Sequence, residues 1–295
     1  MSSISDVVSP AYRCGHGSPL VLLHGMSMSW RAWEPVIPLL TDCHEVFAPS
    51  LAGHHGAATG TADTSMSVHG LADAVERQLD EAGIVTAHLA GNSLGGWVAL
   101  ELARRGRARS VVALSPAGGW TTGRELRRVL RLARLGRAFA GHPLLAPMLN
   151  RPRMRRALLR GVLERGHELT SAEARRFFED NLHFSGLREL LAAIERDGPL
   201  PPMSDIGCPV RIAWAGHDRT IPFDTYGRPL AQAVPDAELL TLLGVGHVPM
   251  HDNPQLIADT ILDITRRVDA TEPAGPPQPV TLRQKIRGWL TAKQT

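Results

Sequence analysis

One serine in this chain lies in a setting that could make it a nucleophile. Residues 91–95, Gly-Asn-Ser-Leu-Gly, form a G-x-S-x-G motif that directly follows the apolar run 87–90 and directly precedes the helical pattern 95–104. A serine between a strand and a helix sits in a sharp, strained turn that exposes its hydroxyl and requires small neighbours. The sequence therefore predicts that Ser93 is a nucleophile, against the alternative of a glycine-rich turn with a bystander serine.

A serine hydroxyl needs a base, and the base needs an orienting carboxylate. His247 lies in a glycine-flanked loop just after the apolar run 238–242, and Asp218 follows the run 210–215. The chain order is therefore Ser93, Asp218, His247, which differs from the orders of the chymotrypsin and subtilisin types. The chemistry predicted is attack of Ser93 on a carbonyl carbon, with His247 as general base and then general acid, and Asp218 orienting the imidazole.

Short strands alternating with helices must position these residues. Apolar runs bounded by turn residues occur at 20–23, 45–48, 87–90, 110–114, 210–215 and 238–242, and helical patterns at 30–40, 67–82, 95–104, 223–234 and 254–268. Runs buried on both faces are typical of parallel strands. The alternation predicts an α/β fold with a doubly wound, mostly parallel sheet.

Residues 118–204 break this alternation. They contain no strand signal, and a capping box at Thr170–Glu173 opens a helix expected to reach about Phe184. A second helix, 187–197, stops at Gly198-Pro199. We therefore expect a core of residues 1–117 and 205–268 with a helical lid, 118–204, inserted between two strands. This lid is rich in arginine. Two interpretations are open: the arginines bind an acidic substrate or an acyl carrier partner, or they form a solvated face.

These motifs together resemble the α/β-hydrolase superfamily, in its lid-bearing single-domain branch. The resemblance runs from about residue 19 to 265 and rests on residues 22–25, 91–96, 216–218 and 246–247, in that order. Residues 50–56 are also similar to the family's PGHG-type loop. The family normally opens with a β-hairpin, which must be short here because about 18 residues precede the first clear strand.

The resemblance implies the remaining parts of the site. A tetrahedral intermediate needs two N–H donors, and losing one costs about 3–4 kcal/mol. The family pattern places these donors on the main chain of Met26 and Leu94. No cofactor is implied. Dehalogenases and epoxide hydrolases of this fold carry Asp where this chain carries Ser93, which argues against both activities.

The 13 histidines do not predict a metal site, because none has ligand spacing with a carboxylate. The resemblance implies that His24 and His54 hold turns. His251 is expected at the surface where the last helix starts, and Asp252 is too near His247 in sequence to serve as its acid. Both are expected to lie outside the catalytic machinery.

The substrate pocket is the part that motifs describe least. Ligands bind beyond the carboxyl ends of the strands in open α/β sheets. Trp120 and Met250 lie in such loops, and Ser27 lies in the loop after the first strand. We expect these three to line the pocket.

Composition limits the classes of function. The chain has 295 residues and a mass of 31.9 kDa, of which 43% are hydrophobic and 21% charged, so one α/β domain with an insertion fits. A net charge of +3 does not imply nucleic-acid binding. Cys14, Cys43 and Cys208 are odd in number and far apart, so neither a disulfide framework nor a zinc site is indicated. With no signal peptide and no apolar stretch of about 20 residues, a cytoplasmic enzyme is expected.

The C-terminal segment has a different character. Residues 269–279 are proline-rich and predict a linker. Residues 280–295 carry four basic residues and no acid, with Leu282, Ile286, Trp289 and Leu290 on one helical face. This helix is a candidate for peripheral membrane or protein contact, against packing on the chain itself or disorder.

The function predicted is hydrolysis of a carboxylic ester, thioester or lactone of a fairly apolar acyl compound through an acyl-enzyme. One alternative is hydrolysis of a carbon–carbon bond in a diketone-like acid, since the Gly-Asn-Ser elbow resembles that subgroup. Val248 stands where that subgroup has an aromatic residue after the catalytic histidine. The other alternative is a binding protein that keeps the fold without hydrolysis. The natural substrate and the oligomeric state are not predicted.

Overall fold

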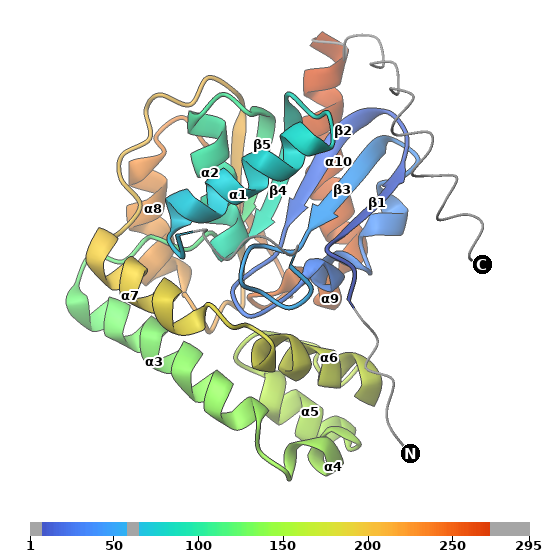
Figure 1. Cartoon of the computed structure of the whole chain (residues 1–295), viewed down its shortest axis with the longest axis vertical. Helices are drawn as coiled ribbons and strands as arrows, with labels where there is room; N and C mark the ends of the chain where they lie inside the picture. Colours follow the sequence, from blue (N-terminus) through green and yellow to red (C-terminus); the bar gives the residue numbers. More distant parts are fainter. Residues whose placement is uncertain (1–7, 58–64, 272–295) are drawn as a thin grey trace.

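A twisted sheet forms the centre of the molecule (Figure 1). The computed structural model describes residues 8–57 and 65–271, and within them the strand order is β1-β3-β2-β4-β5-β6-β7. Strand β1 pairs antiparallel with β3, and every other pair is parallel. The strands are β1 Ala11–Gly15, β2 Ser18–Leu23, β3 His44–Pro49, β4 Ala87–Asn92, β5 Ala108–Leu114, β6 Val210–Ala215 and β7 Glu238–Leu242. The mostly parallel sheet agrees with the sequence prediction. The opening strand β1 is short, but it pairs with β3 instead of forming the expected hairpin with β2.

Apolar side chains fill both faces of the sheet. Along β2, Val21 and Leu23 belong to one buried cluster, and Leu20 and Leu22 belong to another. Helices α1 and α2 pack on the first face, and α10 packs on the second. Because neighbours along a strand point to opposite faces, an unbroken apolar run is what this burial requires.

Helices connect the strands, and five of them lie between β5 and β6. These five form what we call the helical insertion; in Figure 1 it covers one end of the sheet. Its helices are α3 Gly123–Ala140, α4 Leu145–Leu149, α5 Pro152–Leu159, α6 Ser171–Leu182 and α7 Leu187–Asp197. The others are α1 Val68–Glu81, α2 Leu94–Arg104, α8 Arg228–Ala233, α9 Pro249–Asp252 and α10 Pro254–Thr271, with short turns η1 Trp30–Trp33, η2 Ile37–Leu39 and η3 Phe223–Gly227. The capping box that the sequence indicates at Thr170 and Glu173 is present.

One predicted helix is wrong. Residues 30–40 form the two short 3₁₀ turns η1 and η2 instead of a single helix. Pro35 and Pro38 explain the difference, because proline lacks the amide proton that a continuous helix needs and its ring collides with the preceding turn.

Two further expectations need correction. Strand β7 is not buried on both faces, since four of its five residues are exposed; it is the edge strand and pairs only with β6. The linker does not begin at Asp269, because α10 continues to Thr271. The rest of the predicted linker and the helix 280–295 lie outside the described residues.

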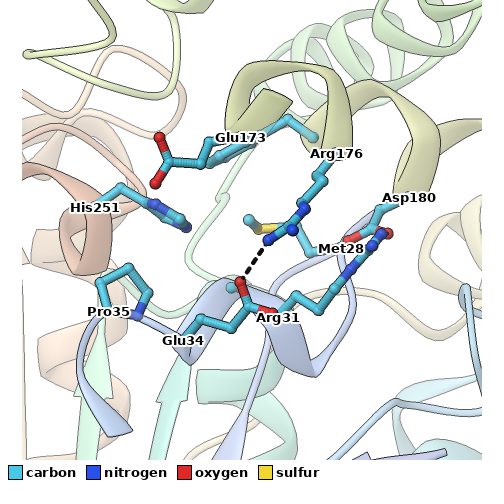
Figure 2. A pocket seen from close by; sticks show the side chains of 10 residues that line it. Met28, Arg31, Glu34, Pro35, Glu173, Arg176, Asp180 and His251 are labelled. Carbon is cyan, nitrogen blue, oxygen red and sulfur yellow. Dashed lines mark hydrogen bonds and ion pairs between the residues drawn. The ribbon is translucent and has the colours of Figure 1, made fainter. Parts of the chain in front are cut away.

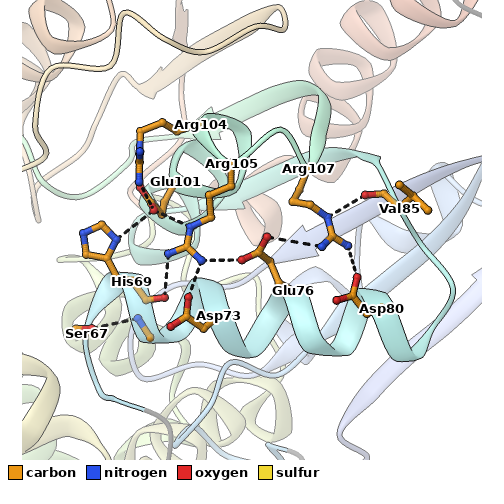
Figure 3. A network of polar contacts seen from close by, with 11 residues as sticks. Ser67, His69, Asp73, Glu76, Asp80, Val85, Glu101, Arg104, Arg105 and Arg107 are labelled. Atoms are coloured by element: carbon orange, nitrogen blue, oxygen red, sulfur yellow. Dashed lines mark hydrogen bonds and ion pairs between the residues drawn. The ribbon is translucent and has the colours of Figure 1, made fainter.

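An ion-pair network fastens α1 to α2 (Figure 3). Arg105 on the end of α2 bonds to Asp73 and Glu76 of α1 at 2.6 and 2.7 Å and to Glu101 at 2.7 Å. Burial opposes ionisation of Glu101, but hydrogen bonds from Arg104 and Arg105 outweigh it and lower the pKa of Glu101 to about 2. The helix that begins beside Ser93 is thereby held in place at its other end.

A buried polar cluster fastens α10 to the amino-terminal ends of the central strands β2, β4 and β5. The Asp269 carboxylate accepts hydrogen bonds from Ser18 at 2.6 Å, Arg109 at 2.8 Å and His88 Nε2 at 3.0 Å. His44 contacts the Ser18 hydroxyl at 2.9 Å. Burial lowers the pKa of both His44 and His88, so both rings are neutral at neutral pH. These contacts explain why the chain remains helical at Asp269.

Acid should destabilise this fold before the carboxylates are protonated. His24, His44 and His88 have lowered pKa values, that of His24 reaching about 4 from an ordinary 6.5. The unfolded chain therefore binds more protons below pH 6.5, and the free energy of unfolding falls as the pH drops from there toward 4. For His24 alone the loss amounts to about 2 kcal/mol by pH 5. Urea unfolding at pH 7.5, 6 and 5 measures it, and an unchanged free energy across this range would contradict the prediction.

Candidate active site

Ser93 occupies a strained turn between β4 and α2. Its backbone angles are φ 54° and ψ −114°, in the region that disfavours side chains. The turn is held on both sides, because the Ser93 amide donates to Leu114 O at 2.9 Å and the Ser93 carbonyl accepts from Ala117 N at 2.9 Å. A half-buried serine in this conformation presents its hydroxyl at the carboxyl end of the sheet.

The glycines around Ser93 leave no room for side chains, as the sequence predicts. A Cβ on Gly91 would lie 2.2 Å from Gly95 O, and one on Gly95 would lie 2.2 Å from Leu23 O. Gly96 is packed on Pro116, 2.9 Å from where its Cβ would be. The close approach of α2 to β4 and β2 therefore depends on these positions being glycine.

His247 and Asp218 lie together in a buried pair. His247 Nδ1 is 2.7 Å from Asp218 Oδ2. The other carboxylate oxygen of Asp218 accepts the amides of Thr220 at 3.0 Å and Ile221 at 2.8 Å, so the carboxylate cannot rotate freely. A carboxylate partner places the proton on Nδ1 and leaves the lone pair of Nε2 available to take a proton.

Asn92 joins the His247 loop to the serine turn. Its Nδ2 donates to His247 O at 2.9 Å and to Leu114 O at 3.2 Å. Within the described residues no hydrogen bond joins the Ser93 hydroxyl to His247; such contacts are often long in the absence of substrate. The sequence motif contains Asn92, but nothing in the spacing indicates that its side chain reaches a residue 155 positions away.

Asp252 supports the same loop from the other side. It accepts the amides of Gly246 at 2.7 Å, Glu164 at 2.9 Å and Arg165 at 2.7 Å. All its described hydrogen bonds are to main-chain amides, which fits the expectation that it is not the acid of His247. It ties the residue before His247 to the helical insertion.

The two predicted oxyanion donors have free amides. Leu94 is the first residue of α2, and Met26 follows Gly25 in the loop after β2. In the part of the chain that the structure describes, neither main-chain N–H has a hydrogen-bond partner. A Cβ on Gly25 would lie 3.5 Å from the Ser93 Cβ, so this loop closely approaches the serine. An N–H at a helix N-terminus is a favourable donor to developing negative charge.

A cavity of about 250 Å³ lies between η1, α6 and α9. Figure 2 shows Arg176 of α6 reaching Glu34, at 2.9 Å, and Asp180 beside Arg31. The apolar part of its wall includes Met28 and Phe177. Because the cavity carries both charges and apolar surface, it can accept a small amphiphilic molecule.

His251 lines this cavity, so the expectation of a surface position at the start of the last helix is wrong. It lies in the separate short helix α9, with its ring 4.9 Å from that of Phe177, and burial lowers its pKa to about 4. The three predicted pocket residues do not line the cavity. Met250 is fully buried, Trp120 packs against Trp97 with ring centroids 5.6 Å apart, and Ser27 has a positive φ of 63°. Their role in a pocket stays a prediction.

Asp180 fastens the insertion to the loops beside the site. Its carboxylate accepts from Ser29 Oγ at 2.6 Å, lies 2.7 Å from His55 Nδ1 and pairs with Arg31. The side chain is buried although it comes from α6 of the helical insertion. Sequence reasoning missed it, since its partners lie 125 to 151 positions away and belong to no motif.

The histidines of the adjacent loops hold turns, as the resemblance implies. His24 Nε2 accepts the amide of Leu51 at 2.9 Å and its Nδ1 lies 2.8 Å from Gly25 O. His54 stacks on Phe184 with ring centroids 3.7 Å apart. Among the described residues, no group of three or more His, Cys, Asp or Glu side chains is arranged to hold a metal ion.

Comparison with known proteins defines the class. The sequence profile of the alpha/beta hydrolase family matches residues 20–260. Over 204 residues the chain is 36% identical to "Epoxide hydrolase EphH" of Mycobacterium tuberculosis, covering 66% of this chain and 94% of the relative. The enol-lactonase from Burkholderia xenovorans LB400 has a similar structure, with TM-score 0.68 and 19% identity over 87% of this chain and 95% of that one.

A second similar structure is the 2-hydroxy-6-oxo-6-phenylhexa-2,4-dienoate hydrolase from Rhodococcus sp. strain RHA1, with TM-score 0.67 and 21% identity, covering 87% of this chain and 94% of that one. This chain belongs to the alpha/beta hydrolase family. It is an alpha/beta hydrolase enzyme. No helix among residues 8–57 and 65–271 is long and apolar enough to cross a membrane.

Substitution of the buried residues Asp218 and Asp252 should distinguish a catalytic role from a structural one. In Asp218→Asn the imidazole loses the partner that holds its tautomer, so we expect kcat to fall about a thousandfold or more with the fold intact. In Asp252→Asn the amides keep one acceptor oxygen, so we expect a loss of about 1–3 kcal/mol in unfolding free energy and a much smaller loss of kcat. The two measurements are p-nitrophenyl acetate hydrolysis and urea unfolding. Full activity in Asp218→Asn would contradict the assignment.

Proposed function

We propose that this enzyme is a serine hydrolase that cleaves a carboxylic ester, thioester or lactone through an acyl-enzyme. The observation that carries the proposal is the buried hydrogen bond of 2.7 Å between His247 and Asp218, in a loop that Asn92 fastens to the strained turn at Ser93. A serine, an imidazole and a carboxylate so connected are the parts that acyl transfer requires.

The proposed reaction proceeds by proton transfers through His247. His247 Nε2 takes the proton of the Ser93 hydroxyl as the oxygen attacks the carbonyl carbon. Asp218 stabilises the imidazolium that results. The amides of Met26 and Leu94 bind the oxyanion, and His247 returns the proton to the leaving oxygen or sulfur. Water then attacks the acyl-enzyme in the same way, with His247 again as general base. The free acid departs, and the Ser93 hydroxyl is restored.

The helical insertion is proposed to act as a lid over this site. Asp180 and Asp252 each join the insertion to a loop that carries site residues, so its position and that of the catalytic loop are linked. We place the enzyme in the cytoplasm.

Hydrolysis of a carbon–carbon bond is the second candidate. It is favoured by the Gly-Asn-Ser elbow and by the structural similarity to the oxo-dienoate hydrolase named above. Val248, after the catalytic histidine, is buried and apolar, which leaves that position without the aromatic residue expected in that subgroup. A kcat/KM for a vinylogous diketo acid above that for esters would favour this candidate.

Epoxide hydrolysis requires a different nucleophile, although a relative carries that name. A carboxylate that opens an epoxide forms an ester, which water can cleave. The Ser93 hydroxyl would form an ether, which the same site cannot hydrolyse. We therefore expect no multiple turnover of styrene oxide to its diol, measured by chromatography with an ester substrate as positive control. Sustained diol formation that Ser93→Ala abolishes would overturn this conclusion.

Covalent labelling tests the proposed nucleophile. We expect a fluorophosphonate to label the enzyme once per chain, at Ser93, and Ser93→Ala to remove the label. Short p-nitrophenyl esters should be turned over by the wild type, and His247→Ala should lower kcat by about a thousandfold or more. Mass spectrometry locates the label, and Ser115→Ala serves as a control serine at the end of the neighbouring strand. Labelling of Ser93 without turnover of any ester, thioester or lactone would contradict the proposed reaction.

A further inference from the structure

A row of arginines without partners follows one face of α3. Arg124, Arg127, Arg131 and Arg134 are exposed and recur at intervals of three and four residues. Within the described residues none of the four forms an ion pair or hydrogen bond. They line an open groove of about 900 Å³ together with residues 222, 225 and 226. At 1.5 Å per residue the row is about 15 Å long.

This arrangement costs stability unless an anion compensates for it. Like charges three or four residues apart on a helix repel each other. The acid among the groove's lining residues, Glu125, is occupied with the capping box at Thr122 and with Thr121. Just after α2, by contrast, Arg105 and Arg107 each pair with acids of α1. The α3 row is therefore complementary to negative charge outside the chain.

Exposed leucines accompany the arginines. Leu135 is 58% exposed and follows Arg131 by one helical turn, and Leu132 is 39% exposed. Leu144, in the connection to α4, is 60% exposed. Large apolar side chains that are exposed at these positions are not stabilised by burial. Leucines interspersed with arginines are typical of a helix that lies in a membrane interface.

We propose that this surface, defined by Arg124, Arg127, Arg131, Arg134, Leu132, Leu135 and Leu144 and called the α3 face, docks the enzyme on an anionic lipid surface. The arginines bind lipid phosphates, and the leucines enter the boundary between headgroups and acyl chains. A soluble polyanion would account for the arginines but not for the leucines. Figure 1 places α3 on the outer flank of the insertion, where a flat surface can reach it.

The docking is separate from the chemistry at Ser93. Arg128 of the same helix is left out of the α3 face because it donates to the carbonyls of Thr220 and Arg219, at 2.6 and 2.9 Å, next to Asp218. Changes to the α3 face therefore leave the support of the acid loop in place. Vesicle binding and ester hydrolysis can accordingly fail or succeed independently.

Vesicle co-sedimentation of the full chain tests the proposal. We expect binding to vesicles of phosphatidylcholine with one-third phosphatidylglycerol, and much weaker binding to phosphatidylcholine alone. Each arginine near such a surface contributes a factor of about five in partitioning. Arg127→Gln with Arg131→Gln should therefore lower the partition coefficient about 25-fold at about 0.1 M salt, and about 0.5 M salt should weaken wild-type binding toward that of the variant.

The control removes the same charge elsewhere. Arg266→Gln with Arg267→Gln alters the end of α10, which lies on the opposite side of the molecule from α3 in Figure 1, and should change binding by less than about threefold. Glutamine preserves helix propensity in both pairs, and circular dichroism checks the fold. Equal losses in the two double variants would overturn the proposal, because they would show a response to net charge alone.

A separate pair of substitutions tests the contribution of the exposed leucines to vesicle binding. Leu135→Ser with Leu144→Ser should lower binding at both salt concentrations, since apolar burial is not screened by ions. Leu239 and Leu243, 52% and 78% exposed on and after the edge strand β7, provide a matched pair of serine substitutions that should leave binding unchanged. Failure of the wild type to bind anionic vesicles, or binding that survives both α3 double substitutions, would overturn the proposal.

Discussion

The strained turn at Ser93 is the constraint on which the rest of the site depends. A serine at φ 54° is unfavourable by itself, and it persists because β4, β5 and α2 hold its amide and carbonyl and because glycines permit the close contact. Within the described residues, the other non-glycine positions with positive φ are Ser27 and Ser115. They follow β2 and β5, the two strands that flank β4. Backbone strain is thus concentrated where the chemistry is proposed to occur.

A few buried polar side chains join this edge of the sheet to distant parts of the chain. Asn92 bonds to the His247 loop, Asp252 bonds that loop to the insertion, and Asp180 bonds the insertion to the loops after β2 and β3. A buried carboxylate is stable only when its hydrogen bonds are satisfied, so each of these contacts fixes one relative position. The insertion is therefore fixed to the loops that carry the predicted site residues.

Local sequence signals account for the elements and for the proposed triad. The glycine spacing around Ser93, the loop positions of Asp218 and His247, and the capping box at Thr170 each have a short-range physical cause that a sequence displays. The mostly parallel sheet also follows, because strands that alternate with helices are joined by crossovers. The same local reasoning failed where proline broke the expected helix at 30–40.

Other features depend on long-range contacts that no local pattern displays. Asp269 was expected in a linker, but its partners Ser18, His88 and Arg109 lie 251, 181 and 160 positions away and extend the helix through it. His251 is half-buried against Phe177 of the insertion, and its neighbours in sequence do not indicate this contact. Strand β7 is exposed because it is the edge strand. Its position in the sheet is set by the crossover that follows β6, and the residues of β7 itself do not indicate it.

The most direct measurement is a crystal structure of the enzyme inactivated by a phosphonate ester, since its phosphorus imitates the tetrahedral intermediate. The account predicts phosphorus bonded to Ser93 Oγ, with the phosphoryl oxygen about 3 Å from the amides of Met26 and Leu94 and His247 Nε2 facing the reacting oxygen. Phosphorus on another residue, or a phosphoryl oxygen directed away from both amides, would contradict it.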